Sequence, residues 1–348
     1  MKTDGDAQAD SPGPNSGLLG RLRGGKRGMN SGLTFLMLAS LFPTSCNADS
    51  GPPVSKIGIH MINRYTGGAK KIVAANCPVI KILDTGPDML AALKDFKTRH
   101  PGGLTVLRIY TPTQYDSDSD PRSCARDYWE KWLHPNLKSL TDQQKKWIDY
   151  LEGPNECDNT PCWGSVDEAK WFCEFWLELA GMMSKNGFRP CVGSIPVGNP
   201  PGSPEEIEAK IKAFIPALRL AKKLDGAWSY HAYTLKYTKD SGVEDWYSLR
   251  YRRFYKLFER LAPDLAALPL LLTEGGVDSD GSRPDKPGWK RESAEKFQEW
   301  LKWFDSEIKR DPYVKGVTLF EIGHPENWNS FDLESIADWL AGYLGESR

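Results

Sequence analysis

The sequence has little of what several common classes of protein require. It contains only five histidines in 348 residues, and its seven cysteines include no Cys-x-x-Cys pair. Multi-histidine and thiolate zinc centres are therefore disfavoured, and we expect no metal. Lys and Arg number 45 against 46 for Asp and Glu, a net charge of −1, so we expect no basic surface for nucleic acid.

The Gly-x-Gly-x-x-Gly loop of dinucleotide-binding sheets is missing from the place where it would be needed. The segment after the first predicted strand, residues 61–68, reads Met-Ile-Asn-Arg-Tyr-Thr-Gly-Gly. An open doubly wound sheet normally carries its phosphate-binding loop there. We therefore expect no organic cofactor, and an open sheet is the second choice of fold.

The apolar run near the N-terminus is too short to cross a bilayer, and we expect no membrane span. Residues 33–42 are apolar, basic residues precede them and small residues follow. This order is typical of a secretory signal, about residues 29–48. We predict that residues 1–52 form a disordered leader and that the protein is secreted or periplasmic. Lipid anchoring at Cys46 is the less favoured alternative, because Pro43 stands where a lipoprotein signal has leucine.

Cleavage of such a signal would leave six cysteines, and an even number permits disulfides in an exported protein. Cys157 and Cys162 are close enough in sequence to close a small loop, so we predict a disulfide between them. With Cys173 they could instead bind a metal through thiolates, but their spacing does not support this.

Strand-like and helix-like segments alternate from residue 54 onward. Thr141 with Gln144, and Ser203 with Glu206, have the spacing of capping boxes and predict two helix starts. Eight strands with intervening helices in about three hundred residues are typical of a (β/α)₈ TIM barrel, an α/β fold. We predict a single such domain over residues 53–348 and expect a monomer. The predicted strands cover residues 56–61, 78–83, 104–110, a segment ending at 156, 190–193, 227–233, 268–274 and 316–321.

Two carboxylates stand at the ends of predicted strands, where a TIM barrel carries its catalytic residues. Glu156 ends the fourth strand and Glu274 the seventh. Cleavage of a glycosidic bond normally uses two carboxyl groups on opposite sides of the bond. The thirteen tryptophans could provide flat platforms for sugar rings or could fill the core. Other polar residues at strand ends are His60, Lys81, Asp84, Arg108, Tyr110, Asn155, His231, Tyr233 and Glu321.

Three features stand on these predicted strands: Asn155-Glu156 at the end of the fourth, Glu274 at the end of the seventh, and Tyr230-His231-Ala232-Tyr233 on the sixth. In this arrangement the sequence resembles clan A of the glycoside hydrolases, the retaining, cellulase- and mannanase-like barrels. The resemblance follows the order of elements through the whole barrel, but only about five positions by residue. It implies cleavage of a β-linked oligo- or polysaccharide through a covalent glycosyl-enzyme. It indicates no family within the clan.

The resemblance implies a role for each matching residue. Glu156 would be the acid/base and Glu274 the nucleophile. Asn155 would bond the 2-hydroxyl of the sugar, while His231 and Tyr233 would line the site and orient Glu274.

Three departures from the clan pattern concern the sugar next to the cleaved bond. Cys157 stands where proline is common, Phe320 stands where tryptophan is common, and the arginine often found after the second strand is missing. Further contacts with the substrate are expected from Arg108, Trp328, Glu321 and His60.

Several alternatives stay open at this level. Glu156 could be a helix-start carboxylate, and Glu274 a salt-bridge partner. Glu152 shares the strand parity of Glu156 and could compete for the acid role, although pairing inside the barrel is favoured. Glu321 could hold a structural arginine instead of a sugar hydroxyl. The alternative functions are a catalytically inactive carbohydrate-binding barrel and a transglycosylase with the same site.

Overall fold

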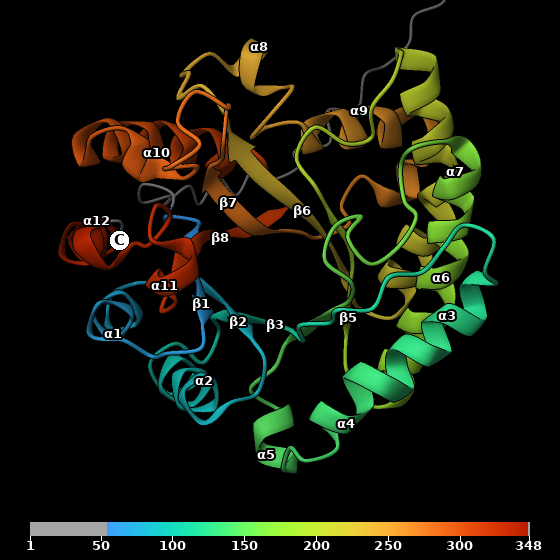
Figure 1. Cartoon of the computed structure of the whole chain (residues 1–348), viewed down its shortest axis with the longest axis horizontal. Helices are drawn as coiled ribbons and strands as arrows, with labels where there is room; N and C mark the ends of the chain where they lie inside the picture. The colour runs from blue at the N-terminus through green and yellow to red at the C-terminus, as the bar shows by residue number, and fades with distance from the viewer. Residues whose placement is uncertain (1–53, 347–348) are drawn as a thin grey trace, which may run out of the picture. The chain divides into compact units, whose positions relative to one another are not determined.

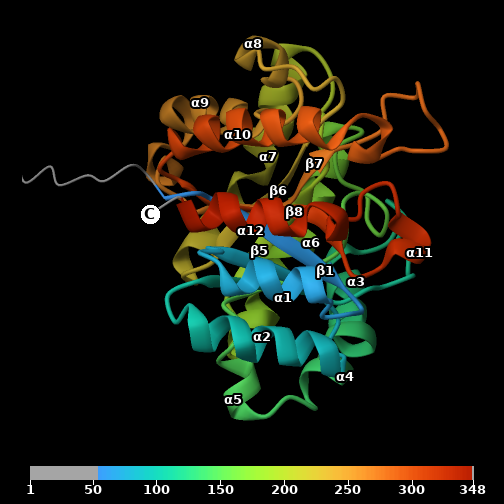
Figure 2. The ribbon, with the colours of Figure 1, turned by 90° about the vertical axis from the view of Figure 1, so that its left-hand side faces the viewer.

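In a computed structural model that describes residues 54–346, eight parallel strands close into a barrel in chain order, β1 to β8. The helices surround this barrel (Figure 1), and the side view shows α1, α2, α10 and α12 lying alongside the strands (Figure 2). The predicted (β/α)₈ fold is confirmed. The predicted leader, with its signal peptide and Cys46, lies outside the described residues and stays a prediction.

The strands have alternating side chains, so that one set points into the barrel and the other toward the helices. An apolar layer that includes Val79, Val106 and Tyr150 fills the barrel near the N-terminal ends of the strands. Two residues further along the same strands, and therefore also inward, come Lys81, Arg108 and Glu152. The strands are β1 Ile57–Ile62, β2 Val79–Leu83, β3 Leu104–Arg108, β4 Tyr150–Glu152, β5 Pro190–Ile195, β6 Ala227–Thr234, β7 Leu270–Val277 and β8 Val314–Ile322.

The helices bury apolar faces against the outer side of the strands in one large core. Both predicted capping boxes are confirmed, since Thr141 and Ser203 each exchange hydrogen bonds with the residue three positions on. The α-helices are α1 Gly67–Ala74, α2 Pro87–Arg99, α3 Pro121–Tyr128, α4 His134–Leu137, α5 Asp142–Lys145, α6 Val166–Lys185, α7 Pro204–Lys223, α8 Ser241–Glu244, α9 Tyr251–Leu261, α10 Ala294–Lys309, α11 Pro325–Trp328 and α12 Ala337–Glu346. A π-helical turn, η1 Trp129–Leu133, joins α3 to α4, and short 3₁₀ turns cover Pro263–Leu265 (η2), Trp289–Arg291 (η3) and Glu334–Ile336 (η4).

Two predicted strand ends are wrong, and both matter for the site. β4 ends at Glu152, four residues before Glu156, because Gly153-Pro154 follows and proline has no N–H for the ladder. β7 does not stop at Glu274 but continues to Val277. Gly275 pairs with Ala232 of β6, and a Cβ there would lie 2.7 Å from the Val317 side chain, so this glycine permits close strand packing and does not end the strand.

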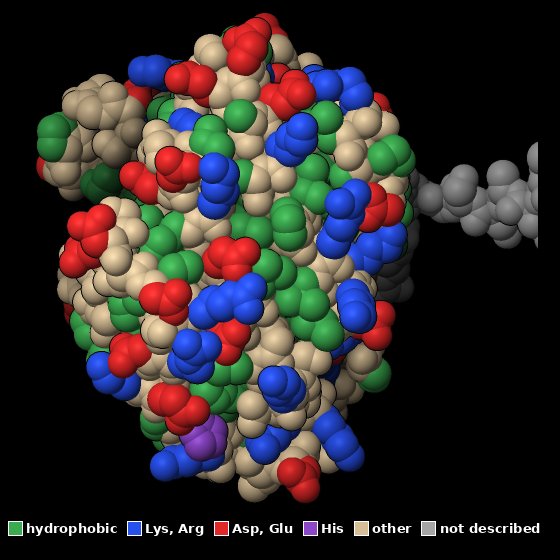
Figure 3. All heavy atoms as spheres, turned by 90° about the vertical axis from the view of Figure 1, so that its right-hand side faces the viewer, with side chains coloured by type: hydrophobic (Ala, Val, Ile, Leu, Met, Phe, Trp, Pro, Cys, Tyr) green, Lys and Arg blue, Asp and Glu red, His purple; other side chains and the backbone are tan. Residues whose placement is uncertain are grey.

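The outer surface carries both signs of charge. On the face in Figure 3, basic and acidic side chains are interspersed without a field of one sign. Within residues 54–346, no helix is long and apolar enough to span a membrane.

Candidate active site

Glu274 is a buried carboxylate held on both oxygens by the barrel interior. Tyr233 donates its hydroxyl hydrogen to Oε2 over 3.0 Å, and the Lys81 ammonium lies 3.1 Å from Oε1. His60 Nδ1 and Arg108 Nη2 lie 3.7 and 3.8 Å from the same Oε1. These donors come from β1, β2, β3 and β6, so the orientation of Glu274 is fixed by strands and not by loops.

The surroundings of Glu274 favour its ionised form. Burial alone would raise the pKa of this carboxyl, but the neighbouring His231, Lys81 and Arg108 together hold the pKa well below its usual value. A carboxylate ionised at neutral pH and fixed in one orientation is suited to nucleophilic attack or to stabilising a developing positive charge.

Glu156 lies on the turn that follows β4, and it points toward Glu274. Its Oε1 is 2.6 Å from Nδ1 of His231, whose Nε2 lies 3.1 Å from the Ser194 hydroxyl. One oxygen of Glu156 and one of Glu274 lie within 4.8 Å of each other. This upper bound on one oxygen pair is compatible with the roughly 5–5.5 Å between the carboxyl groups of retaining glycosidases.

The backbone at Glu156 is in the left-handed region, with φ at 49°. A non-glycine residue there costs roughly 1–3 kcal/mol, so the surrounding structure must hold it. Asn155, the residue before it, accepts a hydrogen bond from Arg108 Nη1 and donates one to Asp158 over 3.0 Å. Arg108 thereby links the loop of Glu156 to Glu274.

Glu152 does not compete for the acid role. It is fully buried, its Oε2 lies 2.7 Å from Lys81 Nζ, and its Oε1 accepts a hydrogen bond from Thr273 over 2.6 Å. Burial would raise the pKa of Glu152, but Lys81 and more distant cations lower it overall. The predicted pairing inside the barrel is therefore confirmed.

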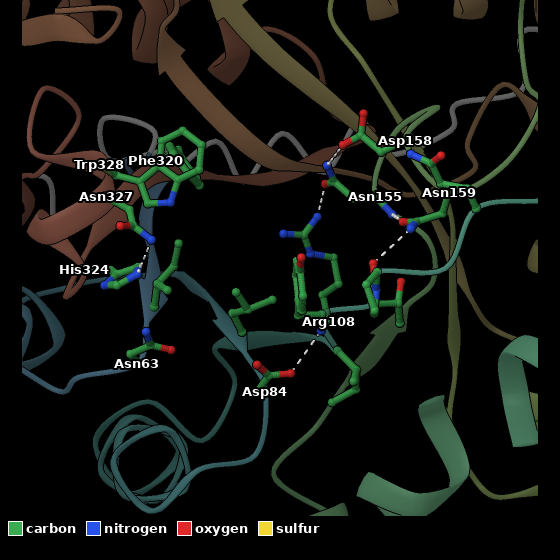
Figure 4. A pocket seen from close by; sticks show the side chains of 17 residues that line it. Asn63, Asp84, Arg108, Asn155, Asp158, Asn159, Phe320, His324, Asn327 and Trp328 are labelled. Carbon is green, nitrogen blue, oxygen red and sulfur yellow. Dashed lines mark hydrogen bonds between the residues drawn. The ribbon is translucent and has the colours of Figure 1, made fainter. Parts of the chain in front are cut away.

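A cavity of about 640 Å³ opens beside the two carboxylates at the C-terminal ends of the strands. Figure 4 shows Arg108 and Asn155 across it from Trp328, whose indole is 41 % exposed and stands edge-on to the Phe320 ring at 5.2 Å. Neither carboxylate is among its lining residues. Arg108, which does line it, lies 3.8 Å from Glu274 and donates to Asn155, the residue before Glu156. The lining residues are Ile62, Asn63, Leu83, Asp84, Arg108, Ile109, Tyr110, Thr111, Pro112, Gln114, Asn155, Asp158, Asn159, Phe320, His324, Asn327 and Trp328.

Four residues expected to line the site or contact the substrate are not among those that line the cavity: His60, His231, Tyr233 and Glu321. His231 and Tyr233 contact the two carboxylates instead. His60 is fully buried against the Phe320 ring, because strand parity places it deep in the barrel near Glu274. Its burial, and secondly Lys81, lower its pKa well below the usual value, so the ring is neutral. Glu321 is also fully buried, and its Oε2 accepts the His324 N–H over 3.0 Å. Among the described residues no arginine pairs with it, so the alternative of a structural arginine is wrong.

Glu321 makes the fold sensitive to pH. Burial raises its pKa to about 8, whereas an unfolded glutamate has a pKa of 4.5. The folded state therefore favours the protonated carboxyl. The stability that this group contributes is fully present below pH 4.5 and is lost as the pH rises through about 8. We expect Glu321→Gln to raise the melting temperature by about 4 °C or more at pH 8 and hardly at pH 4. Thermal unfolding at both pH values tests this, with exposed Glu326→Gln as control, and an equal change at both would contradict it.

Asn159 was missed by sequence reasoning. It is buried, and its Nδ2 donates to the carbonyl oxygens of Thr111 and Thr113 over 2.9 and 2.7 Å. Asn159 is separated from Thr111 and Thr113 by 48 and 46 residues in sequence. A single sequence carries no signal for such long-range contacts.

A divalent metal is disfavoured by the charges at the site. Glu156, His231 and Glu274 offer three donor atoms close enough together for one ion. However, Lys81 and Arg108 already compensate the charge of Glu274 and would repel a cation placed beside it.

The fold and this site define a (β/α)₈ barrel with two juxtaposed carboxylates at the mouth.

No protein-family model matches the sequence, and no curated protein matches it either. Solved structures similar to it include the catalytic domain of a mannanase from Streptomyces sp. SirexAA-E, at 15 % identity over 77 % of this chain and 75 % of the other, with a TM-score of 0.42. A second is the endo-β-1,4-mannanase of Thermotoga petrophila, at 9 % identity over 85 % and 78 %, with a TM-score of 0.41. A third is a 4-O-α-L-rhamnosyl-β-D-glucuronidase of Fusarium oxysporum 12S, at 10 % identity over 86 % and 72 %, with a TM-score of 0.48. At this low identity the similarity concerns the fold alone.

Proposed function

We propose that this protein is a retaining glycoside hydrolase that cleaves a β-linked glycan. The observation that carries the proposal is the close approach of two carboxyls in unlike surroundings. Glu274 is buried among cations and donors, whereas Glu156 is partly exposed and contacts the ring of His231. Two carboxyls kept in different environments can divide the acid and nucleophile roles between them.

In the first step the Glu274 carboxylate attacks the anomeric carbon, and the bond to the leaving oxygen breaks. Glu156 gives its proton to that oxygen, so the departing group leaves as an alcohol. The intermediate is an ester between the sugar and Glu274. In the second step Glu156, now ionised, takes a proton from water while the water oxygen attacks the anomeric carbon and releases Glu274.

The positions of the remaining side chains agree with these roles of Glu274 and Glu156. Tyr233 and Lys81 hold the two oxygens of Glu274 in place, and they stabilise its charge again when the ester is cleaved. Asn155 accepts a hydrogen bond from Arg108 and lines the cavity together with it, where its amide can meet a sugar hydroxyl. Trp328 presents an exposed ring to the cavity, suited to the apolar face of a sugar.

The test is turnover with its stereochemistry. We expect hydrolysis within a panel of 2,4-dinitrophenyl β-glycosides and β-linked polysaccharides, with the β-anomer as the first product seen by proton NMR. Release of the α-anomer first would contradict the retaining mechanism. Binding without turnover across the panel would favour a non-catalytic carbohydrate-binding barrel, and products longer than the substrate would identify a transglycosylase.

A further inference from the structure

We propose that Asn159 and the Cys157–Cys162 disulfide position Glu156, and that reduction of this disulfide selectively disables proton transfer to the leaving group. The inference rests on the proposed role of Glu156 as acid/base. It goes beyond that role because it assigns the site a dependence on one covalent bond outside the cavity.

The backbone of Glu156 lies outside the strands, although its carboxylate meets His231 of β6. β4 ends at Glu152, and the turn that follows places Glu156 at a positive φ, a conformation that relaxes unless it is held. Glu274, by contrast, lies within β7 and is bonded by residues of neighbouring strands. The two carboxyls therefore depend on different parts of the structure.

Two interactions, a hydrogen bond and a disulfide, hold the chain on either side of Glu156. On its N-terminal side, the Asn155 N–H donates to Asn159 Oδ1 over 3.2 Å. On its C-terminal side, Cys157 is bonded to Cys162. Asn159 lies within the ring that this disulfide closes, so the disulfide also constrains the residue that accepts the hydrogen bond from Asn155. Figure 4 shows Asn155, Asp158 and Asn159 gathered on one wall of the cavity.

The ring is anchored to the rest of the barrel at two points. Asn159 donates to Thr111 and Thr113, and its backbone oxygen accepts the Tyr115 N–H over 2.9 Å. Cys162 is buried at the other end of the ring. Opening the disulfide frees Cys157, and with it the C-terminal side of Glu156, while the strand that carries Glu274 keeps its contacts.

The disulfide is open to attack from solvent at one end. Cys157 is exposed, whereas the free cysteines of the described part, Cys77, Cys124, Cys173 and Cys191, are all buried. A dithiol reductant supplies two electrons and two protons, the sulfur–sulfur bond breaks, and two thiols form while the reductant becomes a cyclic disulfide. Reduction at this one place is therefore expected without unfolding.

Displacement of Glu156 should appear in the dependence on the leaving group. A phenolate as stable as 2,4-dinitrophenolate leaves without a proton, whereas a 4-methoxyphenol needs one. For a glycoside that the wild type hydrolyses, we expect dithiothreitol to lower kcat/KM for the 4-methoxyphenyl compound by roughly 10–100-fold. For the 2,4-dinitrophenyl compound of the same sugar we expect a change of less than about threefold.

The matched variant is Cys157→Ser with Cys162→Ser. It should show the same loss without reductant, and dithiothreitol should change it no further, which isolates this disulfide from the other cysteines. In Glu156→Ala, removal of the disulfide should have no additional effect on the 4-methoxyphenyl substrate, because the residue it positions is gone. Circular dichroism of each protein establishes that the fold is retained.

The outcomes separate the two proposals. If the wild type hydrolyses both substrates but reduction lowers both equally or neither, the positioning role is wrong while the hydrolase stands. If the effect of reduction persists undiminished in Glu156→Ala, the disulfide acts through another residue. If the wild type hydrolyses no glycoside of the panel, the proposed function fails, and this inference fails with it.

Discussion

Glu274→Ala is expected to lower kcat for any glycoside substrate by on the order of 10⁵-fold. The reason is that the variant loses the atom that bonds to the anomeric carbon, and no neighbouring group of the right kind replaces it. Glu152 is fully buried and paired with Lys81, so it cannot move into the vacant position. Steady-state hydrolysis of the best substrate of the panel measures the loss.

Azide makes this expectation specific to a nucleophile. In Glu274→Ala the missing side chain leaves room for a small anion, and Lys81 and Arg108 remain to attract it. With a 2,4-dinitrophenyl β-glycoside, azide should restore turnover and yield the α-glycosyl azide, because a single displacement inverts the anomeric carbon. Glu326→Ala removes an exposed carboxylate on α11 and serves as control, with near-normal rates expected.

Loss of the Glu274 charge leaves the buried cations beside it less well compensated, which lowers the stability of the fold. A loss of stability therefore has to be distinguished from a loss of catalytic rate. Glu274→Gln keeps the size of the side chain and an acceptor for Tyr233, and it should fold at least as well as the alanine variant. Both variants should be inactive while retaining wild-type circular dichroism. Near-normal rates in either one would show that Glu274 is not the nucleophile.

Most of the barrel could be predicted from the sequence because its signals are local. Apolar runs of strand length, separated by amphipathic helices with caps at Thr141 and Ser203, follow from propensity and period alone. Strand parity also predicts that Glu152 points inward and pairs inside the barrel, but it does not identify Lys81 as the partner. The two carboxylates were chosen for the same reason, because each follows or ends an apolar run of strand length, and their roles stay a prediction.

What could not be predicted depends on contacts between distant segments. The end of β4 at Glu152 was signalled by Gly153-Pro154. The left-handed turn at Glu156 was not, because Arg108 contacts Asn155 and His231 contacts Glu156 from 47 and 75 residues away. The burial of Glu321 depends on the segment after β8, which folds back so that the Leu333 N–H meets its backbone oxygen. Neither arrangement leaves a pattern in the sequence.

Glu156→Ala is expected to separate substrates by their leaving groups. A substrate whose leaving group needs a proton should lose roughly 10²–10⁴-fold in kcat/KM, whereas a 2,4-dinitrophenyl glycoside should lose little, because its phenolate departs unaided. The second step also slows, since no base activates water, so kcat for the activated substrate should fall together with KM. Measured kcat and KM for both substrates test this.

The identity of the acid follows from how azide acts on this variant. Azide needs no general base, so in Glu156→Ala it should attack the glycosyl-enzyme on Glu274 and give the β-glycosyl azide, with net retention after two inversions. Glu274→Ala should give the opposite anomer from the same reagents, so each variant is the stereochemical control for the other. His231, 2.6 Å from Glu156, would still be present and could supply a proton weakly. If kcat/KM fell equally for both leaving groups in Glu156→Ala, Glu156 would not be the acid.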